Sequence, residues 1–233
     1  PAMSRSKNDD VRGVNAPGVR PAPGALASDL RTRAPQDVRR AVASELERME
    51  RAEDVRVLLA VESGSRAWGF ASPIVYAEDP AFAVVRELAA YCFSPVASAH
   101  HYLSMGRNHL AALAGETVRL KKCLYTMRAI LAARWVVAER APAPMLLRDL
   151  VDAGLEESMR GLAAELLEAK TAGGERGELP RIAALNAWAA GALAQVTGAL
   201  ADVEPPTPVP WERLDEAFLA LVGPAAWRGR TGV

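Results

Sequence analysis

Apolar residues recur at helical spacing along most of the chain, and one stretch alone has the pattern of a buried strand. In residues 36–52 an apolar residue occurs every three or four positions with charged residues between, which predicts an amphipathic helix. Residues 55–61 form a short run that is rich in valine and leucine and almost wholly apolar, which predicts a strand buried on both faces. A second short strand is predicted at residues 74–76.

Beyond Pro80 the pattern is helical almost to the end of the chain. Ser94 and Pro95 suit an N-cap and a first helical position, and Pro142 and Pro144 mark the end of the longest helix. The helices are predicted at about residues 80–91, 95–113, 116–139, 155–170, 180–202 and 211–222.

One or two strands cannot satisfy their own backbone donors and acceptors without a larger sheet, so part of a sheet is missing. We therefore predict an α+β chain that is predominantly helical and retains only a remnant of a sheet-containing core. Residues 1–34, rich in Pro, Gly, Ala, Arg and Ser, are expected to be a disordered tail. Residues 35–76 would form the truncated core, and residues 77–233 a helical domain.

The composition predicts a cytoplasmic protein whose contacts with nucleic acid would depend on a local patch. The 233 residues include 28 basic and 28 acidic ones, so no overall positive field attracts RNA or an anionic membrane. Cys92 and Cys123 fit neither a disulfide framework nor a zinc site and are expected to be small core residues. No run reaches the roughly 20 apolar residues of a membrane span, and no signal-peptide pattern is present.

The turn after the predicted strand carries the clearest binding chemistry. Gly64 and Ser65 follow the strand closely. A glycine lets the backbone approach an oxyanion, and a serine hydroxyl with successive backbone N–H groups can form a phosphate nest. An ordinary turn can have the same two residues, so this pair alone leaves both interpretations open.

The longer stretch Glu-Ser-Gly-Ser-Arg-Ala-Trp-Gly-Phe-Ala-Ser-Pro, residues 62–73, resembles the signature of a bacterial nucleotidyltransferase family. That family has a polymerase-β-like fold and is associated with RNA repair. The resemblance covers roughly residues 36–200 and is strongest in three further segments. These are residues 72–80, 100–103 and 118–135.

The resemblance implies a function for the chain. A nucleoside monophosphate would pass from an NTP to a hydroxyl group, with RNA as a candidate acceptor. Gly64 and Ser65 would hold the triphosphate, and Mg²⁺ would be the cofactor.

The chain departs from that family where the metals would bind. The family continues after Ala-Ser-Pro with a strand of the Asp-Ser-Asp-Tyr-Asp type, in which aspartates at i and i+2 face one side and can share metal ions. Here residues 71–73 run straight into residues 74–76, as if two stretches had been joined at a repeated Ser-Pro. No Asp-x-Asp occurs anywhere in the chain.

Other acids give no replacement for that strand. Glu78 and Asp79 are adjacent, and we interpret them as acids of the next helix's first turn. Glu62 lies beside the turn and is a candidate catalytic acid and single metal ligand. One carboxylate does not make a two-metal site, so the metal site is expected to be incomplete and Mg²⁺ binding impaired.

The helix predicted at 116–139 offers a second candidate surface. Lys121, Tyr125 and Arg128 lie at i, i+4 and i+7, with Lys122 beside them, and such a set suits a phosphate or a stacked base. A solvated charged face with a half-buried tyrosine explains the pattern equally well.

The three histidines are interpreted as structural or surface residues. They are His100, His101 and His109.

The sequence thus predicts a nucleotidyltransferase-family protein that is catalytically impaired because its acidic strand is absent. One alternative is a non-catalytic helical module that binds nucleotide, RNA or a partner protein. Another is a truncated gene product with no function. The expected partners are an NTP and, as a candidate, RNA, with no membrane.

Overall fold

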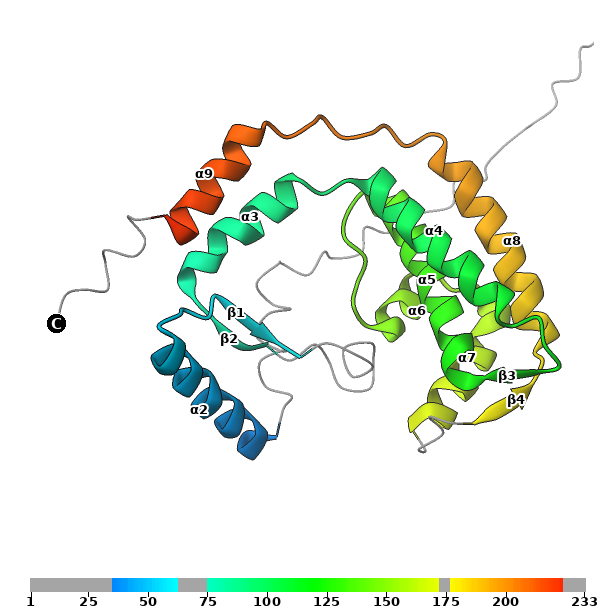
Figure 1. Ribbon diagram of the computed structural model, residues 1–233. Coiled ribbons are helices and arrows are strands. Elements are labelled where there is room, and N and C mark those ends of the chain that lie inside the picture. The colour runs from blue at the N-terminus through cyan, green and yellow to red at the C-terminus, as the bar shows by residue number, and fades with distance from the viewer. Residues whose placement is uncertain (1–34, 63–74, 172–176, 224–233) are drawn as a thin grey trace, which may run out of the picture.

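The computed structural model describes residues 35–62, 75–171 and 177–223. The predicted tail at 1–34 and the turn with Gly64 and Ser65 lie outside this part. Within it the chain forms eight α-helices, a short 3-10 helix and two two-stranded sheets (Figure 1), which confirms the α+β, predominantly helical prediction.

Helices account for most of the described part, and the strands are short. The helices are α2 (Gln36–Glu53), η2 (Pro80–Phe82), α3 (Ala83–Tyr91), α4 (Pro95–Ala111), α5 (Leu120–Glu139), α6 (Leu147–Gly154), α7 (Glu157–Thr171), α8 (Ala183–Leu200) and α9 (Trp211–Val222). The strands are β1 (Leu59–Val61), β2 (Val75–Glu78), β3 (Thr117–Arg119) and β4 (Glu178–Pro180).

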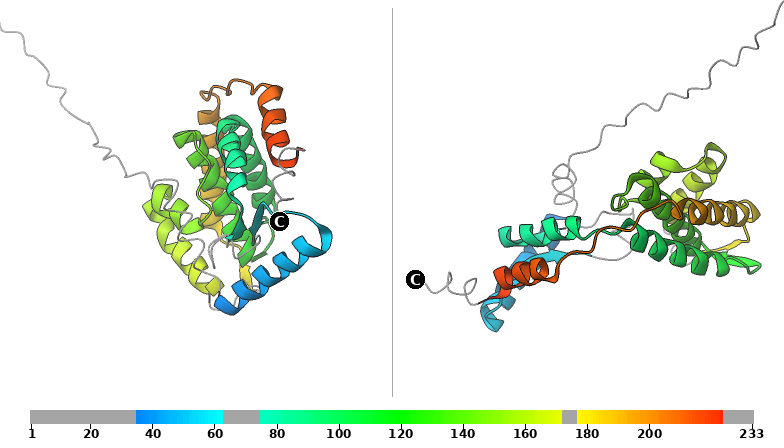
Figure 2. Two further views of the ribbon diagram at one scale, coloured as in Figure 1. Left: turned by 90° about the vertical axis from the view of Figure 1, so that its left-hand side faces the viewer. Right: turned by 90° about the horizontal axis from the view of Figure 1, so that it is seen from above.

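Helix α5 is the centre of the molecule. Twelve of its 20 residues are buried, on every side of the helix, because α4, α6, α7 and α8 surround it (Figures 1 and 2). A helix that is apolar all round can be stable only in such a position. Its apolar residues divide between two clusters, so α5 joins the two halves of the core.

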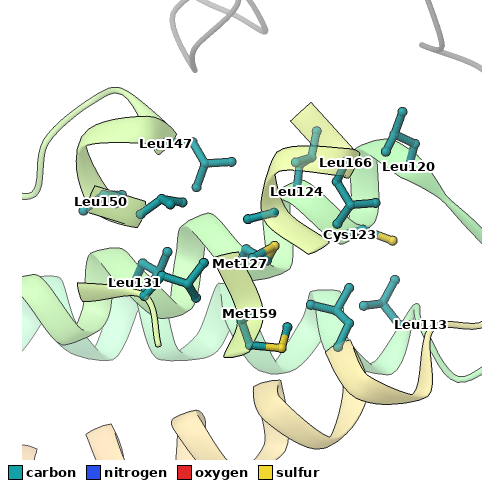
Figure 3. Close-up of a cluster of buried hydrophobic side chains, with 14 of the residues drawn as sticks. Leu113, Leu120, Cys123, Leu124, Met127, Leu131, Leu147, Leu150, Met159 and Leu166 are labelled. Atoms are coloured by element: carbon teal, nitrogen blue, oxygen red, sulfur yellow. The ribbon is translucent and has the colours of Figure 1, made fainter. Parts of the chain in front are cut away.

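The larger cluster lies between α5, α6, α7 and the β3–β4 sheet (Figure 3). Met127 reaches into its middle from α5 and is fully buried, with Met159 of α7 and Leu150 of α6 around it. Cys123 belongs to the same cluster, and burial raises the pKa of its thiol, as expected of a small core residue. The smaller cluster fills the space between α4, α5 and α8.

A group of three hydrogen bonds connects α5, α8 and the segment between α6 and α7. Arg134 of α5 donates to Glu156 at 2.8 Å and to the carbonyl of Gly154 at 2.7 Å. Trp188 of α8 donates its indole N–H to the same carboxylate at 2.7 Å. Burial raises the pKa of Glu156, but the hydrogen bonds from Arg134 and Trp188 outweigh it and hold the pKa below its ordinary value.

The N-terminal elements form a separate and thinner layer. Strands β1 and β2 pair antiparallel, with Leu59 opposite Glu78, and α2 packs beside β2. Helix α9 returns to this side of the molecule and packs on α3 (Figure 1), where the Arg213 guanidinium lies 4.3 Å from the centre of the Tyr91 ring.

The prediction of a strand buried on both faces at 55–61 was wrong. The strand is confined to Leu59–Val61, and the side chains of Leu59 and Val61 are 38% and 49% exposed. No other strand or helix of the described part covers that face, so the apolar run is not buried.

Two of the predicted helices begin later than expected, because their first residues form a sheet whose two strands are distant in sequence. Residues 117–119 and 178–180 are the two strands of the β3–β4 sheet, so the helices expected at 116–139 and 180–202 begin at Leu120 and Ala183. Helix α6 was not predicted.

Ser94 caps α4 as expected, because its hydroxyl accepts from the Ala97 N–H at 3.2 Å. The predicted domain boundary between residues 76 and 77 falls inside β2.

We expect Leu185→Ala to lower the free energy of unfolding by about 2–5 kcal/mol, because a fully buried leucine leaves a cavity between α5 and α8. Leu219→Ala on α9 removes a side chain that is 58% exposed and should cost less than about 1 kcal/mol. Urea denaturation of both variants tests this, and equal losses would contradict the placement of the core.

Candidate nucleotide-binding site

Glu62 follows β1 directly and is held by the neighbouring strand. The Tyr76 hydroxyl of β2 donates to Glu62 Oε2 at 2.8 Å, and the Arg39 guanidinium of α2 lies 6.0 Å from the Tyr76 ring centre. Gly64 and Ser65 come next along the chain but lie outside the described residues, so their phosphate contacts stay a prediction. The structure therefore gives Glu62 a structural partner at the start of the predicted turn.

Asp79 and Glu78 both have structural roles in this layer. Asp79 accepts from the Ala81 N–H at 2.8 Å and is the N-cap of the helical segment, so it lies just before the first turn in which it was expected. Arg56 lies 3.6 Å away. For Glu78 the interpretation was wrong, because it is the last residue of β2 and pairs with Arg86 of α3. Each carboxylate is thus engaged in a contact that holds neighbouring elements together.

The acids near the predicted turn do not fit a pair of divalent cations. Within the described residues no three His, Cys, Asp or Glu side chains converge as a metal-binding group. In the sequence, residues 63–74 contain neither Asp nor Glu. A two-metal centre needs several carboxylates on one side, and from Leu59 to residue 74 the chain supplies Glu62 only.

The start of α5 brings Lys121, Lys122 and Tyr125 together with a histidine. The Lys121 ammonium lies 5.3 Å from the centre of the Tyr125 ring, and the His109 ring of α4 lies 5.7 Å from it on a tilted plane. The sequence pattern gave no sign of His109, because only the packing of α4 on α5 brings it to Tyr125. Lysines, a phenol and an imidazole are groups that can contact a phosphate or a base.

Arg128 is separated from this group by burial. Its side chain is 4% exposed and donates to the carbonyls of Met145 at 3.3 Å and Pro144 at 3.4 Å. The segment before α6 therefore covers the position that helical spacing alone assigned to an open face. Nucleotide contact by Arg128, Lys121, Lys122 and Tyr125 stays a prediction.

The electrostatics of this group are positive. Burial lowers the pKa of His109, and the charge of Lys122 lowers it further. The protonated imidazole is thus disfavoured in the folded chain relative to the unfolded one. The contribution of neutral His109 to the stability of the fold is present above the pKa of about 6.5 that the imidazole has in the unfolded chain. It is lost as the pH falls through the lower pKa of the folded chain.

We expect Lys122→Gln to raise the pKa of His109 toward its ordinary value, since a nearby positive charge is removed while burial remains. Lys121→Gln is the matched control, because Lys121 does not act on His109 in this way. NMR titration of the imidazole ring measures both. An unchanged pKa in Lys122→Gln would show that Lys122 does not face His109.

The comparisons with known proteins agree with the motif. A sequence model described as "RlaP: RNA repair pathway DNA polymerase beta family" matches residues 38–73 and 71–220. The two matched segments meet at residues 71–73, the same place where the acidic strand is missing from the sequence.

Among the residues that the structure covers, no helix is long and apolar enough to cross a bilayer. No solved structure matches the chain.

A relative from Bacillus subtilis (strain 168), the uncharacterized protein YcgL, is 27% identical over 205 residues. The alignment covers 58% of this chain and 77% of the relative. Since 58% of 233 residues is about 135, about 70 of the 205 aligned positions face a gap in this chain.

The family match includes both the strand with its turn and the helical part, and it extends over most of the chain. The chain belongs to the RNA repair pathway DNA polymerase beta family.

Proposed function

We propose that this chain is a nucleotidyltransferase-family protein that does not transfer nucleoside monophosphates by itself. One observation carries the proposal. Of the acids near the predicted turn, Glu62 accepts from Tyr76, Asp79 begins a helix and Glu78 pairs with Arg86, and residues 63–74 add no acid.

The chemistry explains why this loss matters. In transfer from an NTP, divalent cations stabilise the attacking and leaving oxygens, and carboxylates of the protein hold those cations in place. Such electrostatic stabilisation is worth several kcal/mol, and each 1.4 kcal/mol is about a tenfold change in rate. A chain without the carboxylates would therefore be slower by about a thousandfold or more.

The comparisons support an internal loss of sequence, which we assign to residues 71–73 from the family match. The family match is in two pieces that meet at residues 71–73, between β1 and β2. The alignment with the Bacillus relative leaves about 70 positions opposite a gap. In the family resemblance the acidic strand follows this Ala-Ser-Pro.

Nucleotide binding can outlast catalysis, and this is the second half of the proposal. Gly64 and Ser65 are the proposed phosphate contacts, with Lys121, Lys122 and Tyr125 as further candidates. A glycine-serine turn and lysine side chains interact with phosphate oxygens directly, so their contribution to binding does not require the missing acids.

A second candidate function, a non-catalytic helical binding module, is favoured by the complete core around α5. The two clusters draw all their buried residues from the stretch between Ala99 and Val203. The β1–β2 layer contributes none of these residues. The helices can therefore pack as a unit of their own, which is what a separate binding module requires.

We expect no incorporation above background when the full chain is incubated with Mg²⁺, labelled NTPs and RNA, with a polymerase of known activity as the positive control of the assay. Ser65→Ala should weaken NTP binding, measured by equilibrium dialysis, because it removes a proposed phosphate donor. Incorporation by the unaltered chain that disappears in Ser65→Ala would overturn the proposed loss of catalysis.

A chimaera tests the cause of that loss. We expect that inserting, between Ala71 and Ser72, the segment of the Bacillus relative that follows its counterpart of Ala71 will create Mn²⁺ binding, measured by electron paramagnetic resonance. The matched control is the same insertion with its acidic residues changed to their amides. If a folded chimaera, checked by circular dichroism, bound no more Mn²⁺ than this control, the missing segment would not be the metal-binding one.

A further inference from the structure

The exposed apolar side chains of this chain are concentrated in one layer. Eleven large apolar side chains of the described part are exposed, and Met145 is the one that belongs to the helical core side. The other ten lie on or beside α2, β1, α3 and α9. They are Val38, Met49, Val55, Leu59, Val61, Tyr91, Trp211, Phe218, Leu219 and Val222.

Helix α9 exposes the two most exposed of these side chains, both aromatic. Its Ala217 is buried against α3, whereas Trp211 and Phe218 on other sides of the helix are 76% and 62% exposed. With Tyr91, which is 54% exposed, these aromatic side chains display about 400 Å² at 150–250 Å² each. The seven other exposed apolar side chains of this layer add to that area.

Strand β1 offers a backbone edge beside this surface. The Asp79 N–H donates to the Leu58 carbonyl at 3.0 Å, so the backbone groups of Leu58 point toward β2. Because these groups alternate between the two edges of a strand, those of Leu59 point the other way. At Val57 that outer edge is occupied by Glu50 Oε1, which accepts the N–H at 2.7 Å. Within the described residues no strand pairs with the edge beyond it.

We propose that β1 pairs antiparallel with β1 of a second copy of this chain, around a twofold axis at Ala60. Leu59 then lies opposite the partner's Val61. The β1–β2 sheets of the two copies become one sheet of four strands. The outer edge at Val57 is not needed, so the Glu50 contact is kept.

A second copy fits this edge better than other occupants. An antiparallel pair of identical strands is self-complementary about a twofold axis, so no second sequence is required. Residues 57–61 carry no charge or proline that would oppose edge pairing, and a net charge of zero gives no overall repulsion between copies.

The area also suits a dimer. A stable interface buries about 800 Å² on each partner, which three strand residues cannot supply. In the proposed dimer the rest of the area comes from exposed apolar side chains of the same layer, since Figures 1 and 2 show α2, β1, β2, α3 and α9 on one side of the molecule.

Light scattering after size exclusion, from about 1 to 100 μM full chain, tests the pairing. We expect a dimer that Val61→Lys weakens by about tenfold or more, because a charge is placed on the paired edge. Met145→Lys is the matched control, since it adds the same charge to a side chain that is 46% exposed elsewhere. Val61 is 49% exposed, so circular dichroism should show that the variant remains folded.

A cross-link tests the register. Leu58 and Ala60 point their backbone groups toward β2, so Ala60 and the partner's Ala60 would form a non-hydrogen-bonded pair with Cα atoms about 4.5 Å apart, within reach of a disulfide. In a Cys92→Ser background, Ala60→Cys should form a disulfide dimer on mild oxidation and Met145→Cys should not. A monomer at all concentrations, an association that Val61→Lys leaves unchanged, or equal cross-linking of the two cysteine variants would overturn the proposal.

Discussion

The burial of α5 is the constraint on which the rest of the described structure depends. A 20-residue helix with apolar side chains on every face is stable only when other helices cover all of it. Met127 belongs to the larger cluster and Ala133 to the smaller one, and their spacing along the helix places them about 120° apart around its axis, so each cluster uses a different face of the same helix. The positions of α4, α6, α7 and α8 follow from this requirement.

The N-terminal layer has no comparable centre. No residue of α2, β1, β2 or α3 is fully buried, and the sheet that they contribute has two strands. The proposed internal loss of sequence would account for both features of this layer. In the family resemblance an acidic strand follows Ala-Ser-Pro, so its absence would remove a strand from the sheet and the metal-binding acids together.

Much of the fold could be predicted because helix signals are local. Ser94 and Pro95 mark the start of α4, and the spacing of apolar residues gives α2 and α9 within one residue. The β3–β4 sheet could not be predicted, because residues 117–119 pair with residues 178–180, which are distant in sequence, and the local pattern of neither segment indicates its partner. For the candidate site, spacing placed Lys121 and Tyr125 on one face but gave no sign that His109 would join them.

The sequence by itself determined most of the helices, the family and the lack of an Asp-x-Asp strand, because these depend on residues that are neighbours along the chain. Only the tertiary structure decided which of those residues are accessible. Arg128 shows the reason: its place on the helix is set by periodicity, but its burial is set by residues 144 and 145, which pack over it from another part of the chain.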